Sequence, residues 1–146
     1  MKVSSRVDYA LSCLIVIASE YKSQKPVPVK IIAEREHIEV DYVEQLLIIM
    51  KRAGILKSVR GVKGGYLLAD SPETVTAYDV IKAFEGEILE LVCYRKKGRK
   101  SLCIHLDHCE VRSFWTGMQS TLETYLKNST LATLVALRKK EKRKGE

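Results

Sequence analysis

This 146-residue chain lacks long apolar runs, internal repeats and, outside its basic C-terminal end, low-complexity segments. A membrane-spanning helix needs roughly 18 to 20 consecutive apolar residues, and no stretch reaches that length. Residues 11–18 are apolar, but they are too few for a span and are not followed by a secretory cleavage site. We therefore expect a cytoplasmic protein.

Signatures of enzymatic chemistry are also missing. The sequence contains neither a phosphate-binding P-loop nor a recognisable pairing of nucleophile and general base, so we expect a protein that is not an enzyme. What it has in excess is positive charge, with 25 Lys and Arg against 18 Asp and Glu and a net charge of +7. This balance favours a polyanionic partner, although the basic end of the chain contributes to it.

Residues 27–68 have the pattern of a helix-turn-helix followed by a β-hairpin. Two apolar sets at helical spacing predict two helices, separated by His37, Ile38 and Glu39. The sets are Val29, Ile32 and Ala33, then Val43, Leu46, Leu47 and Met50. A turn this short makes the helices cross steeply, so the outer face of the second helix projects into solvent and can enter a DNA major groove.

That outer face carries side chains able to distinguish base pairs. Opposite the apolar side lie Asp41, Gln45, Ile48, Ile49 and Arg52, with Tyr42 and Glu44 on the flanks. In the major groove Gln bonds adenine, Asp and Glu accept from the cytosine amino group, and Arg pairs with guanine. The two isoleucines are unusual there: they could touch thymine methyl groups or pack against another surface.

Residues 55–60 and 66–69 alternate as paired strands do, and the sequence between them, residues 61–65, is rich in glycine. Glycine lets a backbone approach a phosphate closely, and Arg60 and Lys63 bring positive charge to the hairpin tip. A surface hairpin with solvated charges would show the same features. Joined to the preceding helix pair, however, the hairpin indicates a winged helix-turn-helix that binds duplex DNA.

The predicted N-terminal helix, residues 1–20, is apolar nearly all round and should be buried on two sides, with Cys13 as a small core residue. Asp8, in its first turn, is most simply a solvated carboxylate favoured by the helix dipole. A capping-box pattern, Thr76 with Asp79, starts a short helix over residues 77–85, which we expect to pack beneath the wing.

Three cysteines, Cys93, Cys103 and Cys109, fall in a stretch with little periodicity. Thiolates are the ligands that iron–sulfur clusters and zinc select, and the basic residues between these cysteines would offset the charge of a cluster. His105 and His108 make zinc a rival, although the C-x2-C knuckle of a zinc ribbon is absent. A redox disulfide and free thiols are further alternatives.

Residues 110–127 predict the longest helix, and its apolar residues follow the four-three alternation of a coiled coil. This seam consists of Val111, Trp115, Met118, Leu122 and Tyr125. We interpret it as a dimer interface, with packing on its own chain as the alternative. A dimer would present two reading heads to a palindromic operator. A last short helix over residues 131–137 and a frayed basic tail are expected to follow.

Several of these motifs together resemble the bacterial Rrf-type regulators, a family with IscR-, NsrR-, RirA- and CymR-like branches. They are Tyr42-Val43-Glu44-Gln45-Leu46, Ser58-Val59-Arg60-Gly61, Gly64-Gly65-Tyr66-Leu67 and the three cysteines ahead of a long helix. The resemblance extends from residue 2 to about residue 137. It implies a homodimeric transcription factor, expected to be a repressor, whose operator affinity depends on an iron–sulfur cluster sensing nitric oxide, redox state or iron and cluster supply.

The same resemblance implies a ligand set. Cluster-binding branches use three loop cysteines, which correspond to Cys93, Cys103 and Cys109, for a cluster of undetermined type, 2Fe-2S or 4Fe-4S. NsrR-like members add an aspartate from the first helix of the other subunit, and Asp8 stands at the matching place. IscR-like members use a histidine just after the third cysteine, where this chain has Val111. The ligand pattern is therefore most similar to that of NsrR-like members.

The resemblance also implies DNA contacts and leaves two alternatives for function. The expected contacts are Asp41, Tyr42, Glu44, Gln45 and Arg60, with Ser4, Gly61 and Lys63 near phosphate. His37 stands where relatives often have glycine, and Ile48 and Ile49 replace more polar residues. The alternatives are a cluster-free regulator that responds to thiol oxidation or a partner protein, as in the CymR-like branch, and a zinc-stabilised interaction module.

The expected fold is mainly α with a small β-hairpin wing. We divide it into a winged helix-turn-helix domain over residues 1–86 and a cysteine-bearing loop over residues 87–109. The dimerisation helix and a short terminal helix follow over residues 110–137, and residues 138–146 form the basic tail.

Overall fold

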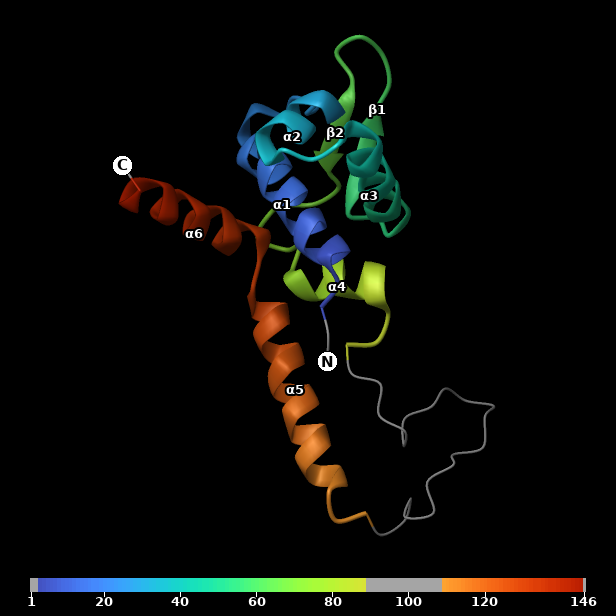
Figure 1. Ribbon diagram of the computed structural model, residues 1–146, viewed down its shortest axis with the longest axis vertical. Coiled ribbons are helices and arrows are strands. Elements are labelled where there is room, and N and C mark those ends of the chain that lie inside the picture. The colour runs from blue at the N-terminus through green and yellow to red at the C-terminus, as the bar shows by residue number, and fades with distance from the viewer. Residues whose placement is uncertain (1–2, 89–108, 146) are drawn as a thin grey trace.

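A computed structural model describes residues 3–88 and 109–145 of the chain. These parts are mainly helical, with one two-stranded antiparallel sheet, which confirms the predicted fold class (Figure 1). The elements are α1 (Ser5–Ser19), η1 (Tyr21–Ser23), α2 (Val29–Glu36), α3 (Val40–Arg52), β1 (Leu56–Val59), β2 (Gly65–Leu68), α4 (Ala77–Glu85), α5 (Arg112–Asn128) and α6 (Leu131–Lys144). Among the described residues no helix is long and apolar enough to cross a membrane.

Helix α1 is the centre of the core. It packs against α2, α3, α4 and α6, and side chains on most of its circumference are buried (Figure 1). Cys13 and Leu14 are fully buried, so Cys13 is the core residue that the sequence predicted. A helix that is apolar nearly all round can be covered only if several neighbours surround it, and the chain supplies those neighbours itself.

The turn between α2 and α3 is as short as predicted. His37 ends α2 with φ of 54°, in the left-handed region that favours glycine, which explains why a glycine suits this position. The Ile38 amide then donates to the Ala33 carbonyl oxygen at 3.0 Å. On α3, the buried residues are those of the predicted inner face: Val43, Leu46, Leu47 and Met50. They fix the rotation of α3 and so determine which side faces solvent.

The hairpin is anchored at its base to the segment before α2. The Val27 and Tyr66 backbones exchange two hydrogen bonds of 2.9 Å each, which adds an isolated bridge to the two paired strands. At Gly65, where φ is 148°, a Cβ atom would overlap the Val27 carbonyl oxygen. Glycine is therefore required for this approach. With its base held, the hairpin projects from the body beside α3 (Figure 1).

Two expectations about the later helices are wrong. Helix α4 has the predicted capping box, but it packs mainly on α1 and α5 rather than beneath the wing. Helix α6 continues to Lys144 instead of ending at residue 137. It is held to the body by the buried Leu131 and by an ion pair between Arg138 and Glu36 of α2. Most of the basic residues near the end of the chain therefore stand on a helix rather than in a frayed tail.

Helix α5 extends away from the rest of the molecule (Figure 1). It has no buried residue. The junction between α5 and α6 is nevertheless tied to the segment around the start of α4: the Ala77 amide donates to the Ser129 carbonyl oxygen at 2.8 Å, and the Leu131 amide to the Val75 carbonyl oxygen at 2.9 Å. A movement of α5 would therefore be transmitted to α4, which contacts α1 and α3.

Candidate nucleic-acid interface

The outer face of α3 is exposed along its whole length. Asp41, Glu44, Gln45, Ile48 and Arg52 are all exposed, whereas Ile49 is half-buried. Because residues three and four apart stand one above another on a helix, these side chains form one continuous face. The structure thus brings together the polar side chains that the sequence predicted to contact base edges.

Tyr42 lies at the border of this face and is held from one side. It is half-buried, and its ring meets the ring of Tyr9 on α1 edge-on, with centroids 5.8 Å apart. Such an edge contact is a favourable geometry for two aromatic rings. Tyr9 therefore orients Tyr42 at the first turn of α3, a role for which the sequence pattern gave no signal.

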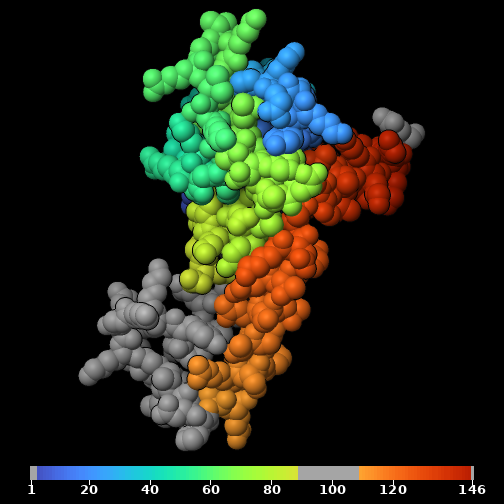
Figure 2. Space-filling view, turned by 180° about the vertical axis from the view of Figure 1, so that it is seen from behind, coloured from blue at the N-terminus to red at the C-terminus, as the bar shows by residue number. Residues whose placement is uncertain are grey.

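The wing tip adds positive charge beside α3. Arg60, Gly61, Val62 and Lys63 are all exposed, and the Gly64 amide closes the turn on the Gly61 carbonyl oxygen at 2.9 Å. Figure 2 shows the wing, in green, standing clear of the body. Cations on a projecting hairpin can reach phosphates that a flat surface could not.

The first turns of α3 and the tip of the wing carry charges of opposite sign. The first turns of α3 present the carboxylates of Asp41 and Glu44, whereas the wing tip presents Arg60 and Lys63. A DNA backbone would repel the former and attract the latter. Carboxylates gain in a major groove only where they accept hydrogen bonds from cytosine amino groups. This arrangement favours sequence-dependent binding over indiscriminate binding.

Ser4 is placed apart from the other predicted DNA contacts. It precedes α1, and its hydroxyl donates to the Glu85 carboxylate at the end of α4. It forms no side-chain cap on α1. Its expected place near phosphate is therefore not one that it shares with α3 and the wing.

Of the predicted cluster ligands, Asp8 and Cys109 belong to the described residues, whereas Cys93 and Cys103, like the rival zinc ligands His105 and His108, lie outside them. Asp8 is exposed in the first turn of α1, and Cys109 is half-exposed just before α5. Within residues 3–88 and 109–145, no three His, Cys, Asp or Glu side chains gather as metal ligands would.

The remaining cysteine has the wrong chemistry for a ligand. Burial, and secondarily the charge of Glu36, raises the pKa of the Cys13 thiol from its ordinary value of 9.0 to about 12. Because a metal binds the thiolate, Cys13 is unsuited to hold one. Cys109 is half-exposed and lies close to the start of α5. Soft thiolate donors with one carboxylate are a set that fits an iron–sulfur centre.

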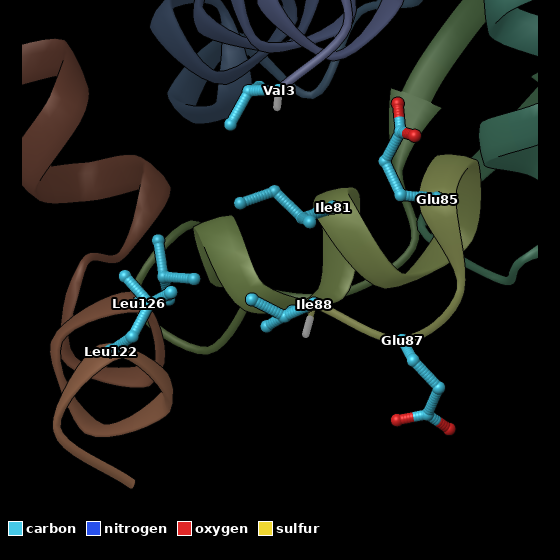
Figure 3. Close-up of a pocket in the computed structure, with 7 residues that line it drawn as sticks. All are labelled: Val3, Ile81, Glu85, Glu87, Ile88, Leu122 and Leu126. Carbon is cyan, nitrogen blue, oxygen red and sulfur yellow. The ribbon is translucent and has the colours of Figure 1, made fainter. Parts of the chain in front are cut away.

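A pocket of about 140 Å³ lies where α4, α5 and the start of the chain meet (Figure 3). Its lining residues are Val3, Ile81, Glu85, Glu87, Ile88, Leu122 and Leu126. Leu122 is thus turned toward its own chain, whereas the other members of the predicted seam are exposed. Sequence periodicity alone could not separate these two directions, because Leu122 continues the same alternation.

Comparisons with known proteins agree with this geometry. A family model described as Rrf2, iron-dependent transcriptional regulator, matches residues 3–137. The HTH-type transcriptional regulator IscR of Yersinia enterocolitica is 32% identical over 135 residues, which cover 92% of this chain and 79% of the relative.

Two solved structures are similar over most of the fold. CymR, the global cysteine regulator of B. subtilis, has a TM-score of 0.74 at 27% identity, covering 94% of this chain and 98% of that one. IscR of T. potens has a TM-score of 0.70 at 31% identity, covering 93% and 87%. The similar proteins are transcriptional regulators, in agreement with the expectation of a DNA-binding protein that is not an enzyme.

Proposed function

This chain belongs to the Rrf2 family of transcriptional regulators, and from that premise we propose that it binds a palindromic operator as a homodimer and represses transcription under the control of an iron–sulfur cluster. The observation that carries the proposal is the exposed polar face of α3 beside a projecting cationic wing. In this proposal α3 enters the major groove, and the wing follows the adjacent phosphates.

Within each reading head the residues have distinct tasks. Gln45 and the carboxylates of Asp41 and Glu44 select bases, and Tyr42 contacts the DNA from the position in which Tyr9 holds it. Arg60, Lys63 and the backbone at Gly61 bind phosphate. Ser4, which lies beside α4, reaches phosphate only if the DNA also passes near the start of α1. We rank it below the others for that reason.

The dimer follows from the exposed apolar side chains of α5. Val111, Trp115, Met118 and Tyr125 are exposed in the single chain, and a contiguous apolar surface of this kind marks an interface. A second copy of α5 with the same heptad-like spacing would cover them. Two reading heads related by a twofold axis would then match a palindrome.

The proposed control by a cluster depends on three cysteines, of which Cys109 lies just before α5, and on one carboxylate. Cys93, Cys103 and Cys109 would hold the cluster, and Asp8 from the partner subunit would complete the set. The cluster supplies reactivity toward nitric oxide, redox change or altered iron supply. A carboxylate is a weaker ligand for iron than a thiolate, so an iron held by Asp8 would be more accessible to a small reactive molecule. Cys109 adjoins α5, and α5 connects to α4 and α6, which gives the site a mechanical path to α3.

A cluster-free regulator is the second candidate, because the chain is also similar to CymR of B. subtilis. Anaerobic purification followed by iron and sulfide analysis and absorbance spectroscopy distinguishes the two, with Cys103→Ala as the control. Iron and sulfide in the wild-type protein and their loss in the variant would support the cluster. A colourless wild-type protein without iron would reject it and leave the thiol-based candidate. One zinc per chain without salt-dependent DNA binding would instead support the zinc-stabilised module.

DNA binding is tested separately from the cluster. We expect the purified protein to bind selected genomic fragments more tightly than random duplex at low ionic strength, in the cluster-loaded or the cluster-free form. Equal affinity for all duplexes in both forms would reject the operator-binding function itself.

A further inference from the structure

We infer that Ile48 is a specificity-determining residue that contacts the 5-methyl group of a thymine in each half of the operator. This inference deepens the proposed function and rests on it, because it requires α3 to lie in the major groove. Hydrogen bonding to base edges does not explain an exposed isoleucine on this face of α3. A contact with a thymine methyl group would explain it.

The first support is the position of Ile48 on α3. It stands one turn after Glu44 and one turn before Arg52, so polar side chains that can bond bases flank it on both sides. Its exposed fraction is 41%. The neighbouring Ile49, in contrast, is half-buried. Of the two isoleucines that the sequence placed on the outer face, only Ile48 points fully into the region that DNA would occupy.

The second support is that α3 cannot turn Ile48 inward. The opposite face of the helix is packed into the core through Val43, Leu46, Leu47 and Met50, each with at most 1% of its surface exposed. Rotating the helix by one position would expose Leu47 or Met50, and the fold would lose the burial of a large apolar side chain. The orientation of Ile48 is therefore fixed by the fold before any partner arrives.

The third support is chemical. On the major-groove edge of the base pairs, the thymine 5-methyl is the one methyl group, and the other recognition features are hydrogen-bond donors and acceptors beside small C–H groups. A branched aliphatic side chain that approaches a polar base edge would remove water without replacing its hydrogen bonds, which costs free energy. Against a thymine methyl, the same approach buries apolar surface on both partners. An isoleucine on a reading face is therefore compatible with thymine and unfavourable opposite other bases.

An exposed isoleucine is not unusual by itself, because single apolar residues are common on protein surfaces. Ile31 on α2 provides the comparison, since its exposed fraction of 37% is similar and it lies outside the α3 face. We therefore predict that Ile48 and Ile31, although similarly exposed, differ in their effect on thymine recognition, and this difference can be measured.

The test uses the full chain and duplexes that it selects from a randomised library. In the tightest duplex each thymine is replaced in turn by deoxyuridine, which lacks the 5-methyl group but keeps every hydrogen-bonding atom. For wild-type protein we expect one thymine per half-site at which the replacement weakens binding about fourfold, the equivalent of one buried methyl group. The other replacements should leave the dissociation constant unchanged.

Variants then assign the methyl contact to one side chain. With Ile48→Ala the sensitivity to deoxyuridine at that thymine should disappear, with Ile48→Val it should be partly retained, and with Ile31→Ala it should stay as in the wild type. Circular dichroism confirms that each variant is folded.

The outcomes separate this inference from the function on which it rests. If Ile48→Ala keeps the full deoxyuridine effect, or if no thymine in the selected duplex is sensitive to loss of its methyl, the inference is overturned while operator binding stands. If the chain enriches no duplex over random sequence, operator binding fails and the inference fails with it.

Discussion

Helices α1 and α5 are both rich in apolar residues, but they differ in how much of their surface the rest of the chain buries. Seven of the fifteen residues of α1 are buried, whereas α5 has seventeen residues and none of them is buried. Figure 2 shows α5, in orange, extending from the body of the molecule. The chain itself covers most apolar side chains of α1, whereas it leaves Phe114, Trp115, Met118 and Tyr125 of α5 exposed.

This difference separates apolar residues that stabilise the folded chain from apolar residues that should stabilise association of two chains. An apolar side chain contributes to folding only where something removes it from water. For α1 the covering elements are α2, α3, α4 and α6. For α5 the proposed cover is a second copy of the same helix, so its apolar residues should contribute to association rather than to the fold of one chain. The predictions below test this separation.

The largest effect is expected in α1. Leu14 is fully buried, so Leu14→Ala should lower the free energy of unfolding by about 2 to 5 kcal/mol through lost burial and the cavity left behind. Urea denaturation followed by circular dichroism at fixed protein concentration measures the change. The matched variant Thr124→Ala, at an exposed position of α5, should change stability by less than about 0.5 kcal/mol. Equal effects at the two sites would remove the basis of the comparison.

The next effect concerns association. Replacing Trp115 and Met118 together by alanine should weaken self-association by at least about 30-fold, since aromatic and apolar residues at the centre of an interface dominate its free energy. Neither residue is buried in the single chain, so the helical content should be retained. Sedimentation equilibrium over a concentration series gives the dissociation constant.

Ser120→Ala is the control for this pair, because Ser120 is exposed on the side of α5 opposite the seam. It should leave the dissociation constant unchanged. A wild-type protein that stays monomeric at all concentrations would contradict the dimer and leave the exposed face of α5 without its proposed cover.

An effect that is smaller per pH unit is expected from the titration of Cys13, a residue of α1. The pKa of the Cys13 thiol is about 12 in the folded chain, above its ordinary value of 9.0. The unfolded chain therefore loses this proton first as pH rises. Between pH 9 and 12 the unfolding free energy should fall by about 1.4 kcal/mol per pH unit from this group alone. The difference in slope between wild type and Cys13→Ala isolates it from other titrating groups, and equal slopes would contradict the buried thiol.

The sequence could predict those parts of the fold that local signals determine. Local signals were reliable: the capping box of Thr76 and Asp79 starts α4, and the α2–α3 turn lies where the apolar pattern stops. The partners against which a helix packs, and the length of a helix that depends on them, were harder to predict. The packing of α4 on α1 and the continuation of α6 to Lys144 depend on tertiary contacts, such as the ion pair of Arg138 with Glu36, which periodicity does not encode.

In the candidate site too, features set by local pattern were predictable and contacts between distant residues were not. The exposed face of α3 was predictable because the inner residues of this helix are apolar at helical spacing, which leaves the outer ones by elimination. The support of Tyr42 by Tyr9 joins residues far apart in sequence, and no pattern marks it. The cluster ligands are a prediction of another kind, since two of the three cysteines lie outside the described residues.

The smallest effects should come from two ion pairs, one that joins α6 to α2 in the body of the chain and one on α5. Arg138 of α6 pairs with Glu36, whose side chain is only 9% exposed, so Arg138→Ala should cost about 1 kcal/mol by leaving a poorly solvated carboxylate without its partner. On α5, Lys127 pairs with Glu123 at 3.2 Å and stands over the Tyr78 ring of α4 at 4.6 Å, but it is half-exposed to solvent.

For this second pair, Lys127→Ala should cost about 0.5 kcal/mol or less, as expected for exposed ion pairs. It should also raise the pKa of Glu123, which hydrogen bonds from Gln119 and Lys127 hold below its ordinary value. Urea denaturation in low and high salt measures both variants, and salt should diminish only the α5 effect, because a partly buried pair is screened less. If Lys127→Ala lowered the free energy of unfolding more than Arg138→Ala, α5 would be bound to its own chain more strongly than its exposed apolar face implies.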